Sequence, residues 1–128
     1  MPKFRVWMKS LKWMCDVTNI SFDSKFVDIC QQGDTERYTE MSVEFDEITL
    51  MQSTGLFDRN GKEIFEGDIL DYRGRKALVR WHGSYASFIY RFVDEPHKRK
   101  AEWKPLYLAY MKCEIIGNVY ENPELVEV

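Results

Sequence analysis

The chain has 128 residues, of which 45% are hydrophobic and 30% are charged, and its formal net charge is −3. This is enough apolar material for one core or for two small lobes. Its three cysteines, Cys15, Cys30 and Cys113, are an odd number without a close pair, which excludes a disulfide framework and a zinc signature and favours a reducing compartment. No signal peptide opens the chain, and no apolar run approaches the ~20 residues that span a bilayer, so we expect a cytoplasmic protein without membrane contact.

Short β-prone runs dominate the first 52 residues. The segments expected to be strands or to have strand composition are Phe4–Trp7, Met14–Ile20, Phe22–Cys30, Val43–Phe45 and Ile48–Gln52. The four residues 9–12 between the first two runs have the length of a hairpin loop. The polar stretch 31–40 is expected to be a loop. We therefore predict a small N-terminal β lobe over residues 1–52.

A turn-rich segment follows, from Thr54 to Gly67. Asn60-Gly61 supplies two residues that tolerate positive φ, as a tight turn needs, and Gly55 and Gly67 punctuate the neighbouring apolar runs. Asp68 is expected to accept a hydrogen bond in a turn rather than to act as a catalytic acid. We treat residues 53–68 as a connector between two parts of the chain.

The remaining residues, 69–128, read as a second β unit with an inserted loop at 93–112. The expected strands are Ile69–Tyr72, Lys76–His82, Ala86–Phe92 and Glu114–Tyr120, the first three forming a meander. Pro105–Met111 is expected to form one or two helical turns. Gly117 inside the last strand indicates a bulge or a close backbone approach.

Three blocks of the sequence carry a family resemblance: the opening Lys3–Trp7, the segment Thr54–Leu70 and the run Cys113–Leu125. Together they resemble the YopX family of small phage and prophage proteins. The resemblance implies a mainly β protein with an SH3-like barrel in its C-terminal part, a phage or prophage origin inside a host bacterial cell, and a tendency to self-associate. It implies no catalytic residues.

The residues of the chain give little support for catalysis or for a cofactor. The two histidines, His82 and His97, have no partner at metal-ligand spacing. Ser84 and Ser87 lie near His82 but lack a glycine-framed nucleophile turn. We expect no catalytic, cofactor-binding or metal-binding residues.

Charge is divided unevenly along the sequence. From Gly67 to Lys112 there are ten Lys and Arg against five acids, or +5, and the remainder has eight against sixteen, or −8. This pattern fits a basic surface for an anionic partner, two opposite patches that attract one another between subunits, or ordinary solvated surface. The candidate surface residues are Arg75, Lys76, Arg80, Tyr85, Arg91, Lys98, Arg99 and Lys100.

These observations predict a non-enzymatic phage or prophage accessory protein that works by association, as a homo-oligomer or with a host or phage protein. The alternative is a nucleic-acid-binding protein, in which basic and aromatic residues of the barrel bind single-stranded or duplex nucleic acid. That alternative requires the candidate basic residues to share one face.

Overall fold

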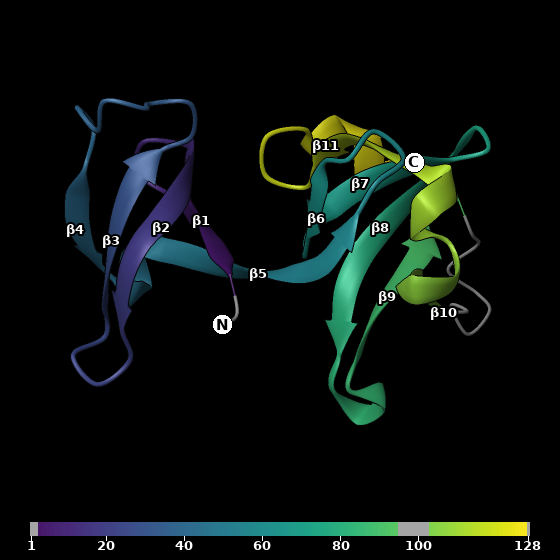
Figure 1. Ribbon diagram of the computed structural model, residues 1–128, viewed down its shortest axis with the longest axis horizontal. Helices are drawn as coiled ribbons and strands as arrows, with labels where there is room; N and C mark the ends of the chain where they lie inside the picture. The colour runs from purple at the N-terminus through teal and green to yellow at the C-terminus, as the bar shows by residue number, and fades with distance from the viewer. Residues whose placement is uncertain (1–2, 95–102, 128) are drawn as a thin grey trace. The chain divides into compact units, whose positions relative to one another are not determined.

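The chain folds into two compact units, each built on an antiparallel β sheet (Figure 1). The computed structural model describes residues 3–94 and 103–127. One unit spans Met1–Gln52 and the other spans Ser53–Val128. Strand β5 (Ile48–Phe57) contributes to both, because its first half pairs with β1 and its second half pairs with β6 (Glu63–Phe65). The predicted mainly β fold class is confirmed.

The first unit is a meander followed by a returning strand. Its strands are β1 (Phe4–Met8), β2 (Trp13–Ser21), β3 (Phe26–Gln31), β4 (Met41–Glu44) and β5, in the spatial order β4-β3-β2-β1-β5. The 3₁₀ turn η1 (Phe45–Glu47) links β4 to β5. The core consists of Val6, Met8, Cys15, Val27, Ile29, Val43 and Ile48. The predicted hairpin between β1 and β2 is confirmed by their register.

Strand β3 begins four residues later than the β composition of the sequence indicates. Lys25 has a φ of +57°, and the Ser21 hydroxyl accepts a hydrogen bond from the Ser24 N–H at 3.2 Å. These features hold residues 22–25 in a turn. Phe22 therefore lies outside the strand, with 59% of its surface exposed, and packs edge to face on Phe4 and Phe45.

The second unit contains a five-stranded sheet in the order β10-β9-β8-β7-β11. Its strands are β7 (Asp68–Tyr72), β8 (Arg75–His82), β9 (Ser87–Phe92), β10 (Lys104–Pro105) and β11 (Cys113–Asn118). The predicted meander of β7, β8 and β9 is confirmed. In the described part of the chain β10 and β11 are edge strands that do not pair with each other, so the sheet is open and the SH3-like barrel is not confirmed.

One face of this sheet forms the core of the second unit. The buried members are Ile64, Leu70, Ala77, Val79, Tyr90, Phe92, Leu106, Ala109 and Cys113. Trp81 shares that face of β8 with Ala77 and Val79, as predicted, but it lies at the far end of the strand. There it packs edge to face on Phe88, with ring centroids 5.0 Å apart, and stays 47% exposed.

Asp58 fastens the turn-rich segment to the last strand. The buried carboxylate accepts the N–H groups of Asn60 and Lys62 through Oδ1 and that of Ile115 through Oδ2, each at 2.9 Å. Gly61 supplies the positive φ of the predicted turn, +81°. Asp58 therefore satisfies backbone donors of both the turn and an edge strand, which would otherwise be an open pairing edge.

The predicted role of Asp68 as a turn acceptor is confirmed. Its Oδ2 accepts the N–H of Phe65 at 2.8 Å, and Gly67 between them has a φ of +88°. The side chain is 1% exposed, which fits a structural role in the turn rather than proton exchange with a substrate.

The predicted helical turns are two short 3₁₀ turns, η3 (Leu106–Leu108) and η4 (Tyr110–Lys112). Leu106 is fully buried and anchors η3 in the core. Strand β11 ends at Asn118, two residues before the predicted end. The Asn118 side chain accepts the N–H groups of Tyr120 and Glu121, which bends the chain toward η5 (Pro123–Val126).

Both alternatives predicted for Gly117 are found. The pairing of β11 with β7 shifts register between Ile115 and Gly117, which is a bulge. A Cβ on Gly117 would lie 2.5 Å from Asn122 Oδ1 and 3.0 Å from Leu125 Cδ1. Any larger residue here would have to displace the Asn122 side chain of the next segment.

Candidate functional site

The sheet face opposite the core gathers three of the candidate basic residues. Ala77 points into the core, so the alternation of side chains along β8 places Lys76 and Arg80 on the other face. Arg80 lies directly opposite Ile89 of β9, and Arg91 is two residues further along the same side of that strand. We call Lys76, Arg80 and Arg91 the basic face.

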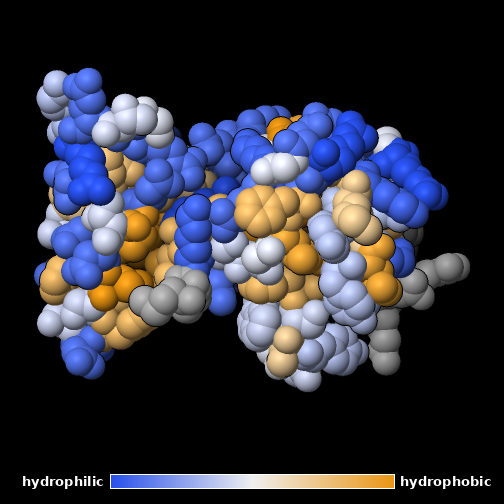
Figure 2. Space-filling model, viewed as in Figure 1, coloured by the Kyte–Doolittle hydropathy of each residue, from blue (hydrophilic) through white to orange (hydrophobic). Residues whose placement is uncertain are grey.

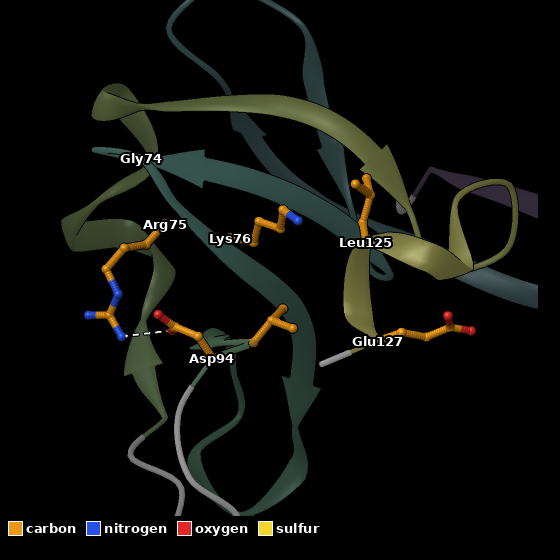
Figure 3. A pocket seen from close by; sticks show the side chains of 7 residues that line it. Gly74, Arg75, Lys76, Asp94, Leu125 and Glu127 are labelled. Carbon is orange, nitrogen blue, oxygen red and sulfur yellow. Dashed lines mark hydrogen bonds and ion pairs between the residues drawn. The ribbon is translucent and has the colours of Figure 1, made fainter.

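Arg75 does not share the basic face. Its guanidinium carbon lies 3.7 Å from the centroid of the Phe92 ring, and its Nη2 lies 2.9 Å from Asp94 Oδ1 (Figure 3). The hydrogen bond from Arg75 holds the pKa of the Asp94 carboxyl below its usual range. Arg75 is therefore already engaged by an aromatic ring and a carboxylate.

A pocket of about 270 Å³ lies where β8 begins and β9 ends. Lys76 lines it between the Arg75–Asp94 pair and the C-terminal residues Leu125 and Glu127 (Figure 3). Cations and carboxylates are mixed in this lining. The pocket therefore offers no single sign of charge to a ligand.

The cluster Lys98-Arg99-Lys100, a third part of the predicted surface, lies outside the described residues. Its relation to the basic face stays a prediction.

Arg91 stacks on an aromatic residue that the sequence did not single out. Its guanidinium carbon is 5.3 Å from the centroid of the Trp103 ring. Its Nε is buried and has no hydrogen-bond partner among the described residues. Arginine stacked on an indole is a common way to hold a planar cation beside a binding surface.

Tyr85, one of the candidate surface residues, is 67% exposed. It lies in the 3₁₀ turn η2 (Gly83–Tyr85), and its ring stacks on His82 at a centroid distance of 4.1 Å. His82 Nδ1 accepts the backbone N–H of Tyr85 at 3.3 Å. His82 thus has a structural role in fixing the turn that presents Tyr85.

An aromatic pocket of about 230 Å³ lies beside Tyr85. Its lining residues are Tyr85, Ser87, Ile89, Trp103, Pro105 and Tyr107, which we call the aromatic pocket. Sequence reasoning identified Tyr85 but missed Trp103 and Tyr107, because they follow a segment without a recognisable pattern. The signal that the sequence offers is the presence of these rings soon after the charged stretch 94–102.

The turns η3 and η4 present large apolar side chains to solvent. Tyr107, Leu108 and Met111 are 60%, 70% and 71% exposed. We call these three residues the apolar turn surface. On the face drawn in Figure 2, apolar side chains of the second unit lie open among polar ones.

The titratable groups of the described residues bear on two kinds of site, a metal centre and a reactive thiol. Within residues 3–94 and 103–127, no three His, Cys, Asp or Glu side chains gather as metal ligands. Burial raises the pKa values of Cys15 and Cys113 to about 11, so both stay protonated thiols at neutral pH. A protonated, buried thiol is a poor nucleophile.

The sequence of this chain matches the model of a known protein family. The model of the family described as YopX protein matches residues 3–127. The chain belongs to the YopX family. Among solved structures, it is similar to the crystal structure of protein EF1440 from Enterococcus faecalis, with a TM-score of 0.61 and 31% sequence identity over 99% of each chain.

No curated protein matches this YopX chain significantly. In the described residues, no helix is long and apolar enough to cross a membrane.

Proposed function

We propose that this YopX protein acts without catalysis, by associating with itself and with a second protein of its phage or host bacterium. The observation on which the proposal rests is the apolar turn surface. Monomeric proteins seldom leave neighbouring large apolar side chains exposed without a function in binding. Leu108 and Met111 belong to consecutive turns of a segment that Leu106 fixes to the core, so the surface is presented on an ordered support.

Charge gives weaker support to self-association than the sequence indicated. The first unit, residues 1–52, has six Lys and Arg against nine acids, and the second unit, residues 53–128, has twelve of each. The basic segment 67–112 thus shares its unit with the acidic residues of 53–66 and 113–128. We therefore base the association on apolar contact rather than on attraction between oppositely charged units.

Light scattering at low and high salt tests this choice. Apolar association persists or strengthens as salt is added, whereas head-to-tail pairing of charged patches weakens. We expect a mass above that of a monomer at high protein concentration in both conditions. A monomer at high concentration and low salt would contradict self-association.

Nucleic-acid binding is the second candidate, and the basic face is the observation that favours it. Lys76, Arg91 and Arg80 are diagonal neighbours across β8 and β9, which suits contacts with successive phosphates. Such binding would be weak, almost independent of base sequence and steeply reduced by salt.

Fluorescence anisotropy with labelled oligonucleotides at low salt tests the second candidate. The variant Lys76→Glu/Arg80→Glu should abolish binding, and the control Lys9→Glu/Lys12→Glu, with the same charge change in the first unit, should retain it. Nonspecific dissociation constants are about 1–100 µM at physiological salt and fall further at low salt, so absence of binding at about 50 µM protein and low salt would remove this candidate.

A further inference from the structure

The aromatic pocket has the size and lining of a site for one or two side chains rather than for a cofactor. Its volume of about 230 Å³ lies below the ~300–1,000 Å³ typical of small-molecule sites. Three aromatic rings and the ring of Pro105 line it, with no carboxylate among its lining residues. Flat apolar walls of this kind receive proline rings, which have little conformational entropy to lose on binding.

The rings also bring hydrogen-bond donors to the pocket. Tyr85 and Tyr107 each have a hydroxyl and Trp103 has an indole N–H, and none of these groups donates to another described residue. An extended polyproline segment has no internal hydrogen bonds, so its carbonyl groups are available to such donors. Ring walls together with these donors match such a backbone.

The border of the pocket is positively charged. Arg80 lies opposite the lining residue Ile89, and Arg91 lies over the ring of Trp103. Neither arginine forms an ion pair with a carboxylate among the described residues. A segment that enters the pocket therefore meets two available guanidinium groups, which favour an acidic side chain beside the proline.

We propose that the aromatic pocket binds an extended, proline-containing peptide segment of a partner protein, with an acidic residue next to the proline that pairs with Arg80 or Arg91. This inference rests on the proposed association and names the chemistry of the second protein. A peptide suits the site better than single-stranded nucleic acid for two reasons. A nucleic-acid strand stacks its bases on a row of exposed ring faces, whereas these rings line one concave pocket. The second unit also has equal numbers of acidic and basic residues, unlike the basic domains that bind nucleic acid.

Synthetic peptides test the proposal on the full chain. The probes are a labelled ten-residue peptide with alternate prolines and two glutamates, the same peptide with lysines in place of the glutamates, and an alanine peptide with the glutamates retained. Fluorescence anisotropy should show binding of the first peptide, weaker binding of the second and none of the third at about 1 mM protein, the weak limit of measurable affinity.

Two variants identify the site of binding. Tyr85→Ala removes an exposed ring and should weaken binding of the first peptide about tenfold or more. Tyr38→Ala, which removes an 85% exposed tyrosine in the first unit, is the matched control and should leave it unchanged. Arg80→Glu should reverse the preference between the glutamate and lysine peptides, a result that mere loss of structure would not give.

Nuclear magnetic resonance supplies a second readout. The indole N–H signal of Trp103, assigned with Trp103→Phe, should shift on addition of the first peptide, while those of Trp7 and Trp13 stay in place. No shift, or peptide binding unchanged by Tyr85→Ala, would overturn the proposal. An oligothymidylate that shifts the Trp103 signal while no peptide does would also overturn it and assign the pocket to nucleic acid.

Failure of this inference is distinguishable from failure of the proposed function. The apolar turn surface shares Tyr107 with the pocket, but its other two residues, Leu108 and Met111, are not lining residues, and substitutions at these two test self-association alone. If the proline peptide does not bind and the protein still self-associates, the proposed function stands and only the peptide proposal is wrong.

Discussion

At the scale of single residues, Asp58 links the turn-rich segment Thr54–Gly67 to strand β11. Burial alone would raise the pKa of the Asp58 carboxyl, but the hydrogen bonds from Ile115, Lys62 and Asn60 outweigh it, and its pKa lies below the usual value. The charged form is therefore the one that the fold stabilises.

Replacing Asp58 by asparagine should destabilise the second unit by about 2–3 kcal/mol, because a charged acceptor of three N–H groups is lost and an amide N–H₂ would face one of them. Chemical denaturation at pH 7 measures the difference. The control Asp94→Asn, at an exposed ion pair, should change little. Equal effects of the two substitutions would contradict the role given to Asp58.

The same carboxyl predicts a pH dependence. A carboxyl whose pKa is lowered on folding stabilises the fold at pH values above its pKa in the unfolded chain, near 3.9. This stabilisation is lost as the pH falls through the lower pKa of the folded state. The unfolding free energy of the wild type should therefore fall more steeply than that of Asp58→Asn below about pH 4. Parallel curves from pH 6 to pH 2 would show that Asp58 has an ordinary pKa.

Gly117 gives a second residue-scale prediction. A methyl group there would displace the Asn122 side chain, whose Oδ1 accepts the Asn118 N–H at 3.2 Å. Gly117→Ala should cost about 1–3 kcal/mol in thermal or chemical unfolding. Gly83→Ala, where an added Cβ meets nothing within 4 Å, is the control. A Gly117→Ala protein as stable as the control would mean that the contact is easily relieved.

At the scale of elements, β11 completes the sheet of the second unit. Cys113 is 1% exposed and Ile115 packs against the core, so these two side chains are the apolar surface that β11 buries; Ile116 is 39% exposed. A protein ending at Lys112 would leave the edge of β7 unpaired and Asp58 Oδ2 without its donor, the Ile115 N–H. We expect it to aggregate or to lose cooperative unfolding, as size-exclusion chromatography and calorimetry would show; a soluble, cooperative monomer would contradict this.

The elements also show what a sequence can and cannot predict. The turns at Asn60-Gly61 and Gly67-Asp68 and the meander of β7, β8 and β9 were predictable, because their signals are local. The separation of Arg75 from the basic face depends on alternation along β8 and on the partners Phe92 and Asp94. The aromatic pocket depends on the pairing of β10 with β9, a long-range contact that leaves no local pattern.

At the scale of the whole molecule, each unit has its own sheet and core, and β5 runs through both. The surface features proposed to bind partners all belong to the second unit: the basic face, the aromatic pocket and the apolar turn surface. Substitutions on these surfaces should therefore affect association without unfolding the first unit.

The central claim is that the protein associates through the apolar turn surface. It is tested most directly by sedimentation velocity over a wide concentration range, with the wild type compared with the variant Leu108→Asp/Met111→Asp. Both side chains are at least 70% exposed, so the double variant should fold, and Leu11→Asp in the first unit is the control. The account predicts that the wild type and the control form larger species as concentration rises and that the double variant stays monomeric. A monomeric wild type, or a double variant that associates equally well, would contradict it.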